Sequence, residues 1–453
     1  MQTNFKLQQI LKINYPELNL KDIHWKTEDS TLGSILFYKI GSTQDDEKKF
    51  FERIKSSTYS WLIINRAVDQ LPAFCKIIEE VQWPVLQKEI LDVLYPQPKM
   101  KMIGITGTNG KTTTTDLILQ LGHQVGKRGI SLGTLGVRTI GQTLEDFGLT
   151  SPSFIDLRKY LHRYGSDKDF CVMEVSSHAL VQKRLYGIQF DGAGWLSFSQ
   201  DHLDYHKTMD EYFKSKCLLF SYLKDQVVLY VPQEQEGLFQ RLSHQFKNVK
   251  KATLINEELP IFFKTQFNKN NLEVAFSIIK EVFSTDVKIN FEQINPPDGR
   301  FYIRKYFDSY IVVDFAHTPD ALENICQSLR TTFPNYRLKV LFGCGGDRDR
   351  TKRPLMGEVA DKLADELYIT SDNPRSENPE QIIQDIMMGV KKHPVQRITA
   401  RPEAVKKAFS ELENKEILLL AGKGHENYIL INGVKHPYSD IQEVEAFIQR
   451  KNL

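Results

Sequence analysis

The stretch Lys101–Thr113 reads KMIGITGTNGKTT and joins a short apolar segment to a glycine-containing turn and a helical pattern. Lys101–Thr106 predicts a buried β-strand, and Lys111–Val125 predicts a helix. Glycines let the backbone curl around a phosphate, a helix N-terminus presents free N–H groups, and a lysine followed by a hydroxyl suits phosphate and Mg²⁺. Ile105 stands where the strict phosphate-loop pattern has its first glycine, so an ordinary glycine-rich turn is the alternative. The sequence G-K-T at the start of a helix favours a loop that binds ATP or GTP.

Short apolar runs alternate with helical stretches on both sides of residue 300. This alternation predicts α/β domains built on largely parallel sheets. The predicted strands are Phe170–Val175, Ala193–Phe198, Val227–Val231, Tyr310–Phe315, Leu338–Phe342, Glu366–Thr370 and Ile417–Ala421. The predicted C-terminal helices are Pro319–Arg330, Pro354–Leu363, Pro379–Lys392 and Pro402–Leu412.

The composition of the chain excludes several classes of protein. At roughly one domain per 150 residues, 453 residues suggest about three domains, each able to bury a core. A net charge of +2 gives no general reason to bind nucleic acid or an anionic membrane. The five cysteines are too sparse for a disulfide framework or a structural zinc, and no signal peptide or membrane-spanning run is visible. We therefore expect a soluble protein of the cytoplasm.

A proline-containing segment separates the first part of the chain from the predicted phosphate loop. Tyr95–Met102 reads YPQPKMKM, and neither proline nor the residue before it sits well in a helix. We predict three domains, covering residues 1–98, 99–297 and 298–453.

A carboxylate ends one of the predicted central strands. Glu174 in VMEVSSH lies near the carboxyl end of its strand, where α/β sheets place their ligands. A buried carboxylate costs free energy unless it is paired, so backbone N–H groups or an arginine are the alternative partners. With a phosphate loop in the same sheet, a magnesium ligand is favoured.

Four titratable residues follow another predicted strand within DHLDYH, Asp201–His206. Mg²⁺ prefers oxygen ligands, so His202 is not assigned to a metal from its spacing alone. A helix cap or a buried structural histidine is the alternative for either histidine.

A second polar cluster follows three predicted strands of the C-terminal region. The segments are FGCGGDRDRTKRP (Phe342–Pro354), SDNPR (Ser371–Arg375) and AGKGHE (Ala421–Glu426). Strand ends of one sheet would bring Arg348, Arg375, Lys423, His425 and Glu426 to a common rim, although a solvated charge run is the alternative. Two guanidinium groups and a carboxylate suit a zwitterionic ligand with more than one carboxylate. Cys344 lies within this cluster, and a small buried residue is a better interpretation than a nucleophile.

Together these motifs resemble those of the Mur ligase family, from about Lys101 to the C-terminus. They are TGTNGKTT, MEVSSHALVQKR, DHLDYH, DEYFKSK, DFAHTPDALE, FGCGGDRDRTKRPLMG, SDNPR and AGKGHE. The resemblance implies a small N-terminal α/β domain for a UDP-linked substrate, a central P-loop ATPase domain with a parallel or mixed sheet, and a C-terminal Rossmann-like domain for an amino acid. It also implies peptidoglycan precursor synthesis. ATP would activate the glutamyl carboxylate of UDP-N-acetylmuramoyl-L-alanyl-D-glutamate as an acyl phosphate, and the amine of meso-diaminopimelate would displace the phosphate.

The resemblance further implies cofactors and residue roles. ATP and Mg²⁺ are the implied cofactors, and the chain is expected to be a monomer that acts on small molecules. The implied catalytic residues are Lys111, Glu174, His202 and Lys216, and the implied magnesium-site residues are Thr112, Glu174, His202 and Lys216, the last as a carbamate (N6-carboxylysine). The implied ATP contacts are Gly107, Thr108, Asn109, Gly110, Lys111, Thr112, Thr113, Asn271, Arg300 and Asp314. Those to the muramoyl dipeptide are Thr150, Ser151, Ser176, Gln182 and Arg184, and those to diaminopimelate are Arg348, Asp372, Asn373, Arg375, Gly422 and Glu426. Arg375 is implied to distinguish diaminopimelate from lysine, which lacks the distal carboxylate.

The first domain departs from the family pattern. Within Lys26–Phe51, Asp29-Ser30 is followed by Thr31 where the family has arginine, and no D-G-H motif occurs. Ser197 and Tyr302 also replace an asparagine and a glutamate of the family. Two alternatives stay open: the same chemistry on an acceptor that is not anchored through UDP, and a non-catalytic nucleotide-binding paralogue.

Overall fold

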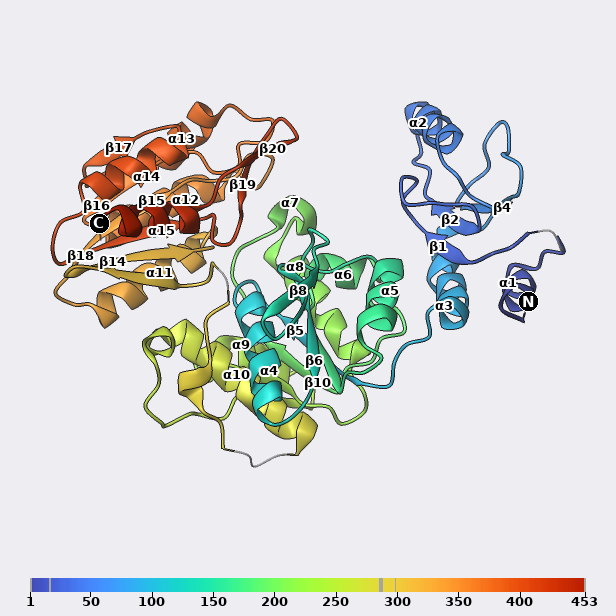
Figure 1. The fold of residues 1–453 in the computed structure, drawn as a ribbon, viewed down its shortest axis with the longest axis horizontal. Helices are drawn as coiled ribbons and strands as arrows, with labels where there is room; N and C mark the ends of the chain where they lie inside the picture. The colour runs from blue at the N-terminus through green and yellow to red at the C-terminus, as the bar shows by residue number, and fades with distance from the viewer. Residues whose placement is uncertain (1, 16–17, 285–287, 298, 452–453) are drawn as a thin grey trace. The chain divides into compact units, whose positions relative to one another are not determined.

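Three β-sheets organise the chain in the computed structural model, which describes residues 2–15, 18–284, 288–297 and 299–451 (Figure 1). The sheets have four, eight and six strands in N- to C-terminal order, which confirms the predicted α/β fold with a small N-terminal domain, a central domain and a C-terminal domain. Backbone packing also groups the chain into two compact units, Met1–Ile103 with Lys127–Asp191 and Leu218–Lys224, and Gly104–Gly126 with Gly192–Cys217 and Asp225–Leu453. The boundaries at 98/99 and 297/298 stay predictions, and residue 298 lies outside the described residues.

The N-terminal sheet is fully parallel, in the order β1-β2-β3-β4. Its central strands are buried on both faces, as parallel strands covered by helices must be. Ile35 and Phe37 of β2 belong to a core that includes α1 and α3, whereas Leu36 belongs to one with Phe50 and Ile54 of α2. The elements are α1 (Gln2–Leu11), β1 (Asp22–His24), β2 (Ser34–Tyr38), α2 (Gln44–Lys55), β3 (Trp61–Ile64), β4 (Cys75–Ile77) and α3 (Trp83–Leu94).

The eight-stranded sheet has the order β12-β11-β10-β5-β9-β6-β7-β8. β6 and β9 are parallel, β7 and β8 add an antiparallel edge, and β10, β11 and β12 are parallel to one another. Its strands are β5 (Lys101–Thr106), β6 (Gly129–Gly133), β7 (Gly136–Thr139), β8 (Gln142–Glu145), β9 (Phe170–Glu174), β10 (Gly192–Trp195), β11 (Leu229–Val231) and β12 (Val249–Lys251). The helices are α4 (Lys111–Gln124), α5 (Phe154–Tyr164), α6 (Ser177–Val181), α7 (Leu203–His206), α8 (Met209–Cys217), α9 (Glu236–Ser243) and α10 (Gln266–Phe283).

The C-terminal sheet has the order β13-β14-β18-β15-β16-β17, with only β13 antiparallel to its neighbour. Helices α11, α12 and α13 pack side by side, and α14 and α15 share a separate core with β14, β15 and β18. Because β15 is parallel to both β16 and β18, the carboxyl ends of these three strands lie at the same end of the sheet. The strands of this sheet are β13 (Tyr302–Tyr306), β14 (Ser309–Asp314), β15 (Arg337–Phe342), β16 (Glu366–Ile369), β17 (Val395–Arg397) and β18 (Glu416–Ala421). β19 (Tyr428–Ile431) and β20 (Val434–Pro437) form a separate antiparallel hairpin. The helices are α11 (Pro319–Thr332), α12 (Lys352–Leu363), α13 (Pro379–Met387), α14 (Arg401–Ser410) and α15 (Asp440–Lys451).

One predicted helix ends early for a structural reason. The pattern Pro379–Lys392 continues past Met387, where α13 stops. A side chain at Gly389 would place Cβ 1.9 Å from the carbonyl oxygen of Pro354, so the chain passes close to α12 there. The Asp361 carboxylate then accepts the N–H groups of Lys391 and its two successors, which holds this segment outside the helix.

No helix in the described part of the chain is long and apolar enough to cross a membrane.

A buried ion pair attaches the last helix to the C-terminal sheet, and it generates a stability prediction. Arg401 and Asp440 are both fully buried, with Nη2 2.6 Å from Oδ2, and Arg401 also donates to the carbonyl of Ala421 at 2.9 Å. We expect Arg401→Met to lower the free energy of unfolding by about 3–5 kcal/mol, because it leaves the Asp440 carboxylate buried without its cation. Urea denaturation followed by circular dichroism measures this.

The control for this prediction is Lys362→Met, which removes a surface pair with Glu323 whose side chains are 67% and 38% exposed. A surface pair contributes about 0–1 kcal/mol, so equal losses in the two variants would contradict the assignment.

Candidate active site

The loop between β5 and α4 has the backbone shape of a phosphate-binding loop. Gly110 has φ +89°, and a Cβ there would lie 2.5 Å from Oδ1 of Asn271. Ser197 fixes the loop, since its carbonyl accepts the Thr108 N–H at 3.0 Å and its Oγ accepts the Asn109 N–H at 2.9 Å. Helix α4 begins at Lys111, so its first free N–H groups lie next to this loop.

Two lysines converge on one carbonyl oxygen of this loop. Lys111 Nζ donates to Gly107 O at 2.9 Å, and Lys216 Nζ donates to the same oxygen at 3.0 Å. Lys216 is only 1% exposed. Burial, and then the nearby Lys111 ammonium, hold the pKa of the Lys216 amine well below its usual value. Lys216 therefore lies beside the phosphate loop as a buried lysine, and its environment favours the uncharged amine more than that of an exposed lysine would.

A cavity of about 200 Å³ adjoins the loop and is lined by six of the ten implied ATP contacts. The other four, which are Gly107, Thr108, Lys111 and Thr112, lie in the loop and at the start of α4 outside its lining. Asn109, Gly110 and Thr113 line one part of it. The Arg300 guanidinium carbon lies 4.5 Å from the centre of the Phe315 ring, and the buried Asp314 carboxylate accepts the Phe301 N–H at 2.7 Å. Aromatic and polar groups beside a phosphate loop suit a nucleoside. The implied contacts Asn271, Arg300 and Asp314 all line the cavity, as do Phe267, Asn268, Phe315 and Asn324, which the sequence analysis missed.

The end of β9 carries a hydrogen-bonded cluster around Glu174, which is 1% exposed. The Thr134 N–H donates to Glu174 Oε1 at 2.8 Å, so a backbone amide does partner this carboxylate. Ser151 Oγ donates to the Glu174 carbonyl at 2.9 Å and lies 3.2 Å from Ser176 Oγ. Thr134 was not predicted, although the glycine-rich turn GTLG after β6 marks its position.

The remaining implied dipeptide contacts join the same cluster. Arg184 Nη1 donates to the Ser151 carbonyl at 2.8 Å, and its Nη2 donates to Gln182 Oε1 at 2.7 Å. Thr134 Oγ1 donates to Thr150 Oγ1 at 3.4 Å. The structure thus links Thr150, Ser151, Ser176, Gln182 and Arg184 in one network.

The two histidines of DHLDYH have different environments. The His202 side chain is 45% exposed, and the residue caps α7 with φ +55°. His206 is buried, its ring centre 5.1 Å from that of Tyr212, which fits a structural histidine. Burial raises the pKa of Asp201, but the nearby His202 and Lys352 outweigh it and hold that pKa below its usual value.

The loops after β16 and β18 meet as predicted, but Lys423 lies inside rather than at the rim. Lys423 is fully buried, and its Nζ lies 3.1 Å from Asp372 Oδ1, 3.0 Å from Glu426 Oε2 and 2.9 Å from Asn373 Oδ1. Asn373 Nδ2 donates to Glu426 at 2.8 Å. Gly422, with φ +105°, brings the chain next to Asp372. Lys423 thus holds together three of the implied diaminopimelate contacts, Asp372, Asn373 and Glu426, and the expectation of a rim position for it is wrong.

His425 also differs from its expected place with the arginines. Its ring packs against Phe315, with ring centres 5.1 Å apart, on the side of the nucleotide cavity.

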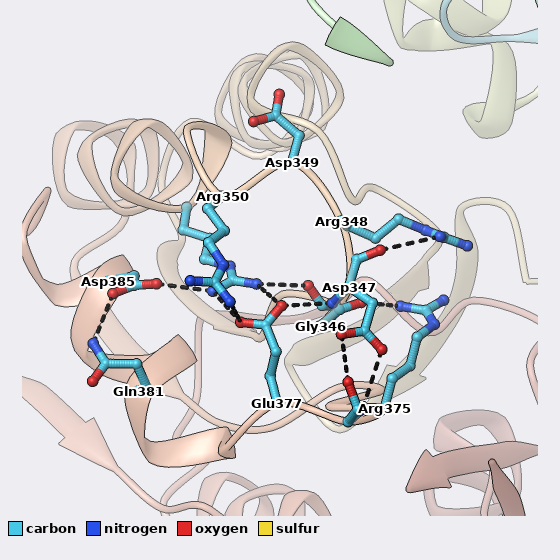
Figure 2. Close-up of polar contacts among 12 residues, drawn as sticks. Gly346, Asp347, Arg348, Asp349, Arg350, Arg375, Glu377, Gln381 and Asp385 are labelled. Carbon is cyan, nitrogen blue, oxygen red and sulfur yellow. Dashed lines mark hydrogen bonds and ion pairs between the residues drawn. The ribbon is translucent and has the colours of Figure 1, made fainter. Parts of the chain in front are cut away.

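Figure 2 shows Arg348 and Arg375 pointing to the same side of the loop that follows β15. Arg375 adopts φ +53°, and its Nη1 donates to the Gly346 carbonyl at 2.7 Å. Burial, and then the nearby Arg348, lower the pKa of the Arg375 guanidinium. Two neighbouring cations repel one another, and a carboxylate ligand would relieve that repulsion through bidentate hydrogen bonds.

Cys344 is a small buried residue, as predicted. It is 3% exposed, and burial raises the pKa of its thiol to about 12, so no nucleophilic thiolate forms near neutral pH.

Known protein families resemble this chain over most of its length. The family model "Mur ligase middle domain" matches residues 105–293, and "Mur ligase, glutamate ligase domain" matches residues 299–424. UDP-N-acetylmuramoyl-L-alanyl-D-glutamate–2,6-diaminopimelate ligase 1 of Clostridium acetobutylicum is 33% identical over 445 residues, which covers 91% of this chain and 92% of the relative. The chain belongs to the Mur ligase family. Ligases with the same substrate name from Aquifex aeolicus (34% identical, 91% of this chain and 90% of the relative) and Prochlorococcus marinus (30% identical, 99% of each) are also similar.

Solved Mur ligase structures share the fold. A structure of UDP-N-acetylmuramoyl-L-alanyl-D-glutamate–2,6-diaminopimelate ligase is 28% identical, covers 99% of both chains and has a TM-score of 0.61. The MurF ligase from Thermotoga maritima in complex with ADP has a TM-score of 0.63, covers 96% of this chain and 99% of its own, and at 14% identity shows the fold alone.

Within the Mur ligase family, the departures of this chain have local structural roles. Ser197 replaces the usual asparagine and fixes the phosphate loop through its backbone carbonyl and its side chain. Tyr302 replaces the usual glutamate, and its hydroxyl donates to Glu445 of α15. In the first domain, Ser30 Oγ donates to the Thr27 carbonyl at 2.7 Å, so the segment that lacks the family arginine forms a local turn.

The close contact at Gly110 generates a prediction. Gly110→Ala adds a Cβ 2.5 Å from Asn271 and 2.9 Å from Leu196 to a backbone that alanine rarely adopts. We expect a loss of about 2–4 kcal/mol in the free energy of unfolding, from overpacking and backbone strain together. Chemical denaturation with urea checks this value.

Gly141→Ala is the matched control, because Gly141 also has a positive φ, +74°, but a Cβ there meets nothing within 4 Å. It should cost only about 1 kcal/mol for the backbone alone. If Gly110→Ala lowers the free energy of unfolding by no more than Gly141→Ala does, the loop does not pass as close to α10 as described here.

Proposed function

We propose that this chain is the ATP-dependent ligase that joins meso-diaminopimelate to UDP-N-acetylmuramoyl-L-alanyl-D-glutamate in peptidoglycan precursor synthesis. The observation that carries the proposal is the neighbouring pair Arg348 and Arg375, in the same strand-end region as the Glu426 carboxylate. An amino acid with two carboxylates and an ammonium matches these charges. Lysine offers no distal carboxylate to the second arginine, and the similar relatives carry the name of the diaminopimelate enzyme.

ATP supplies the driving force for the bond. Its phosphates would lie along Gly107–Thr113, with Lys111 providing positive charge, and its adenosine in the cavity with Asn271, Arg300 and Asp314. A helix N-terminus beside a glycine turn favours a phosphate at that position.

Magnesium suits the oxygen donors that the chain offers. Mg²⁺ is commonly held by one or two carboxylates together with substrate phosphates, and among the described residues no three or more His, Cys, Asp or Glu side chains are placed to hold a metal ion by themselves. The donors proposed for it are the Thr112 hydroxyl, the Glu174 carboxylate, His202 and Lys216 as a carbamate. When bound, Mg²⁺ neutralises charge on the transferring phosphoryl group.

The reaction has two balanced steps. A glutamyl carboxylate oxygen of the acceptor attacks the γ-phosphorus of ATP, and ADP leaves, so that a poor electrophile becomes an acyl phosphate. The neutral amine of diaminopimelate then attacks the acyl carbon, the tetrahedral intermediate expels phosphate, and the nitrogen loses a proton. The residues of the chain act mainly by positioning and by neutralising charge, with Lys111 on the phosphates.

The acceptor and the amino acid use separate groups of residues. Thr150, Ser151, Ser176, Gln182 and Arg184 are proposed to contact the muramoyl dipeptide, and Arg348, Asp372, Asn373, Arg375, Gly422 and Glu426 the diaminopimelate. The enzyme is proposed to work as a monomer in the cytoplasm, where such soluble precursors would be made.

A second candidate keeps this chemistry but takes an acceptor that is not anchored through UDP. The turn at Thr27–Ser30, which replaces the family arginine motif, is the observation that favours it.

Phosphate release tests both candidates. With ATP, Mg²⁺ and UDP-N-acetylmuramoyl-L-alanyl-D-glutamate, we expect turnover with meso-diaminopimelate and little with L-lysine. Turnover only with an acceptor that lacks UDP would replace the first candidate by the second. No turnover with either acceptor would favour the non-catalytic paralogue.

The buried Lys216 generates a further prediction. A neutral amine attacks CO₂ to form a carbamate and releases a proton, so the low pKa of Lys216 supports carbamate formation. Lys216→Ala should abolish turnover, and the wild-type protein in ¹³C-bicarbonate should show a carbamate carbon resonance that this variant lacks.

Lys214→Ala is the control for this prediction. Lys214 lies on the same helix α8, but its side chain is 74% exposed. It should retain near wild-type turnover, and wild-type turnover in Lys216→Ala would refute the carbamate assignment.

A further inference from the structure

A buried ionic cluster lies next to Arg348 and Arg375, the two arginines of the proposed diaminopimelate pocket (the pocket arginines; Figure 2). Arg353, in the first turn of α12, is fully buried and was not singled out by the sequence analysis, which left open a solvated charge run here. Its guanidinium forms two parallel hydrogen bonds to Glu377, at 2.9 and 3.0 Å, and one to Asp385 of α13 at 2.8 Å. Arg350 reaches the same Glu377 carboxylate from the surface, at 3.1 Å.

Glu377 connects this cluster to the loop that carries Arg348. Its Oε1 accepts the backbone N–H of Asp347 at 2.6 Å. The Asp347 carboxylate in turn accepts the Ser376 hydroxyl at 2.7 Å. These two hydrogen bonds therefore link Asp347, in the loop after β15, to Ser376 and Glu377, in the loop after β16. Arg348 directly follows Asp347 in the sequence, and Arg375 directly precedes Ser376.

The backbone of Arg375 is fixed from the other side as well. Its N–H donates to the Leu430 carbonyl at 3.0 Å, and its carbonyl accepts the Asn432 N–H at 2.8 Å, both from the β19–β20 hairpin. A non-glycine residue at φ +53° costs free energy and persists only where its surroundings determine it. Gly346 allows the close approach, since a Cβ there would lie 1.9 Å from the Pro374 carbonyl oxygen.

The two pocket arginines need such support because they repel one another. A flexible pair would separate and lose the spacing that a bidentate carboxylate contact requires. An ionic cluster is a costly way to fill a core, since apolar residues of the same volume often stabilise a fold as well or better. The hydrogen bonds of this cluster connect Arg353 through Glu377 to the backbone N–H of Asp347. They fix the position of the loop that carries Arg348, which apolar packing could not do.

We propose that Arg353 and Glu377 are positioning residues that set the spacing of the Arg348 and Arg375 guanidinium groups, and so determine recognition of the distal carboxylate of the incoming amino acid. This inference rests on the proposed function, because the distal carboxylate belongs to diaminopimelate.

The test is a steady-state comparison of Glu377→Gln and Arg353→Lys with the wild-type enzyme. Each variant should raise the KM for meso-diaminopimelate by about 10- to 100-fold, as misplacement of a binding group by an ångström does. The KM for ATP and the kcat at saturating diaminopimelate should change by no more than about threefold, because the nucleotide residues are untouched. The preference for meso-diaminopimelate over L-lysine should fall by the same factor as the KM rises.

The matched control is Glu416→Gln. Glu416 is even more deeply buried than Glu377, 1% against 10% exposed, and pairs with Lys339 at 2.8 Å. It is the first residue of β18, so it lies at the amino ends of the parallel strands, away from the loops that carry Arg348 and Arg375. The same isosteric change there should leave the KM for diaminopimelate within about threefold of the wild type.

Ser376→Ala keeps the inference falsifiable if a buried variant fails to fold, because Ser376 is exposed and alanine removes only its hydroxyl hydrogen bond to Asp347, leaving the bond from its backbone N–H. It should raise the KM for diaminopimelate several-fold, with the KM for ATP unchanged. An unchanged KM for diaminopimelate in the folded variants, or an equal rise in every kinetic constant including those of Glu416→Gln, would overturn the positioning role. Failure of the wild-type enzyme to use diaminopimelate would instead refute the proposed function.

Discussion

The carbonyl oxygen of Gly107 is the acceptor on which the phosphate end of the site depends. Two lysine amines donate to it, one from the first residue of α4 and one from α8, so a single backbone atom fixes the position of both amines. The loop can present that oxygen because Ser197 holds its next two residues and because Gly110 passes against Asn271 without a side chain. The approach of Gly110 to Asn271 also places the nucleotide cavity, since both residues line it.

Local sequence signals predicted the parts of the site that are set by strand ends. β5 occupies the predicted residues, and α4 begins at the predicted lysine, because an apolar run followed by glycines and a helical pattern specifies that unit without help from distant residues. The meeting of the loops at Arg348, Arg375 and Glu426 was equally predictable, because parallel neighbours end at the same edge of a sheet.

Burial of charged side chains could not be predicted in the same way. Lys423 and Arg353 belong to polar loop sequences that resemble solvated segments, and only the tertiary arrangement encloses them with Asp372, Glu377 and Asp385. The missed cavity residues Phe267 and Asn268 lie at the start of α10, more than 150 residues from the phosphate loop in the sequence, so no local pattern connects them to it. Thr134 was missed because its backbone N–H and its hydroxyl both donate to Glu174, a residue 40 positions later, and nothing in the sequence around Thr134 identifies that partner.

The burial of Lys216 also restricts which reagents reach its nucleophilic amine. A close-packed interior admits a small, uncharged gas far more readily than a bulky or charged acyl donor. An uncharged lysine amine at the protein surface would be open to acetyl and succinyl donors from metabolism, whereas one that is 1% exposed is screened from them. The carbamate proposed for Lys216 therefore requires an interior that admits carbon dioxide to a side chain that is only 1% exposed.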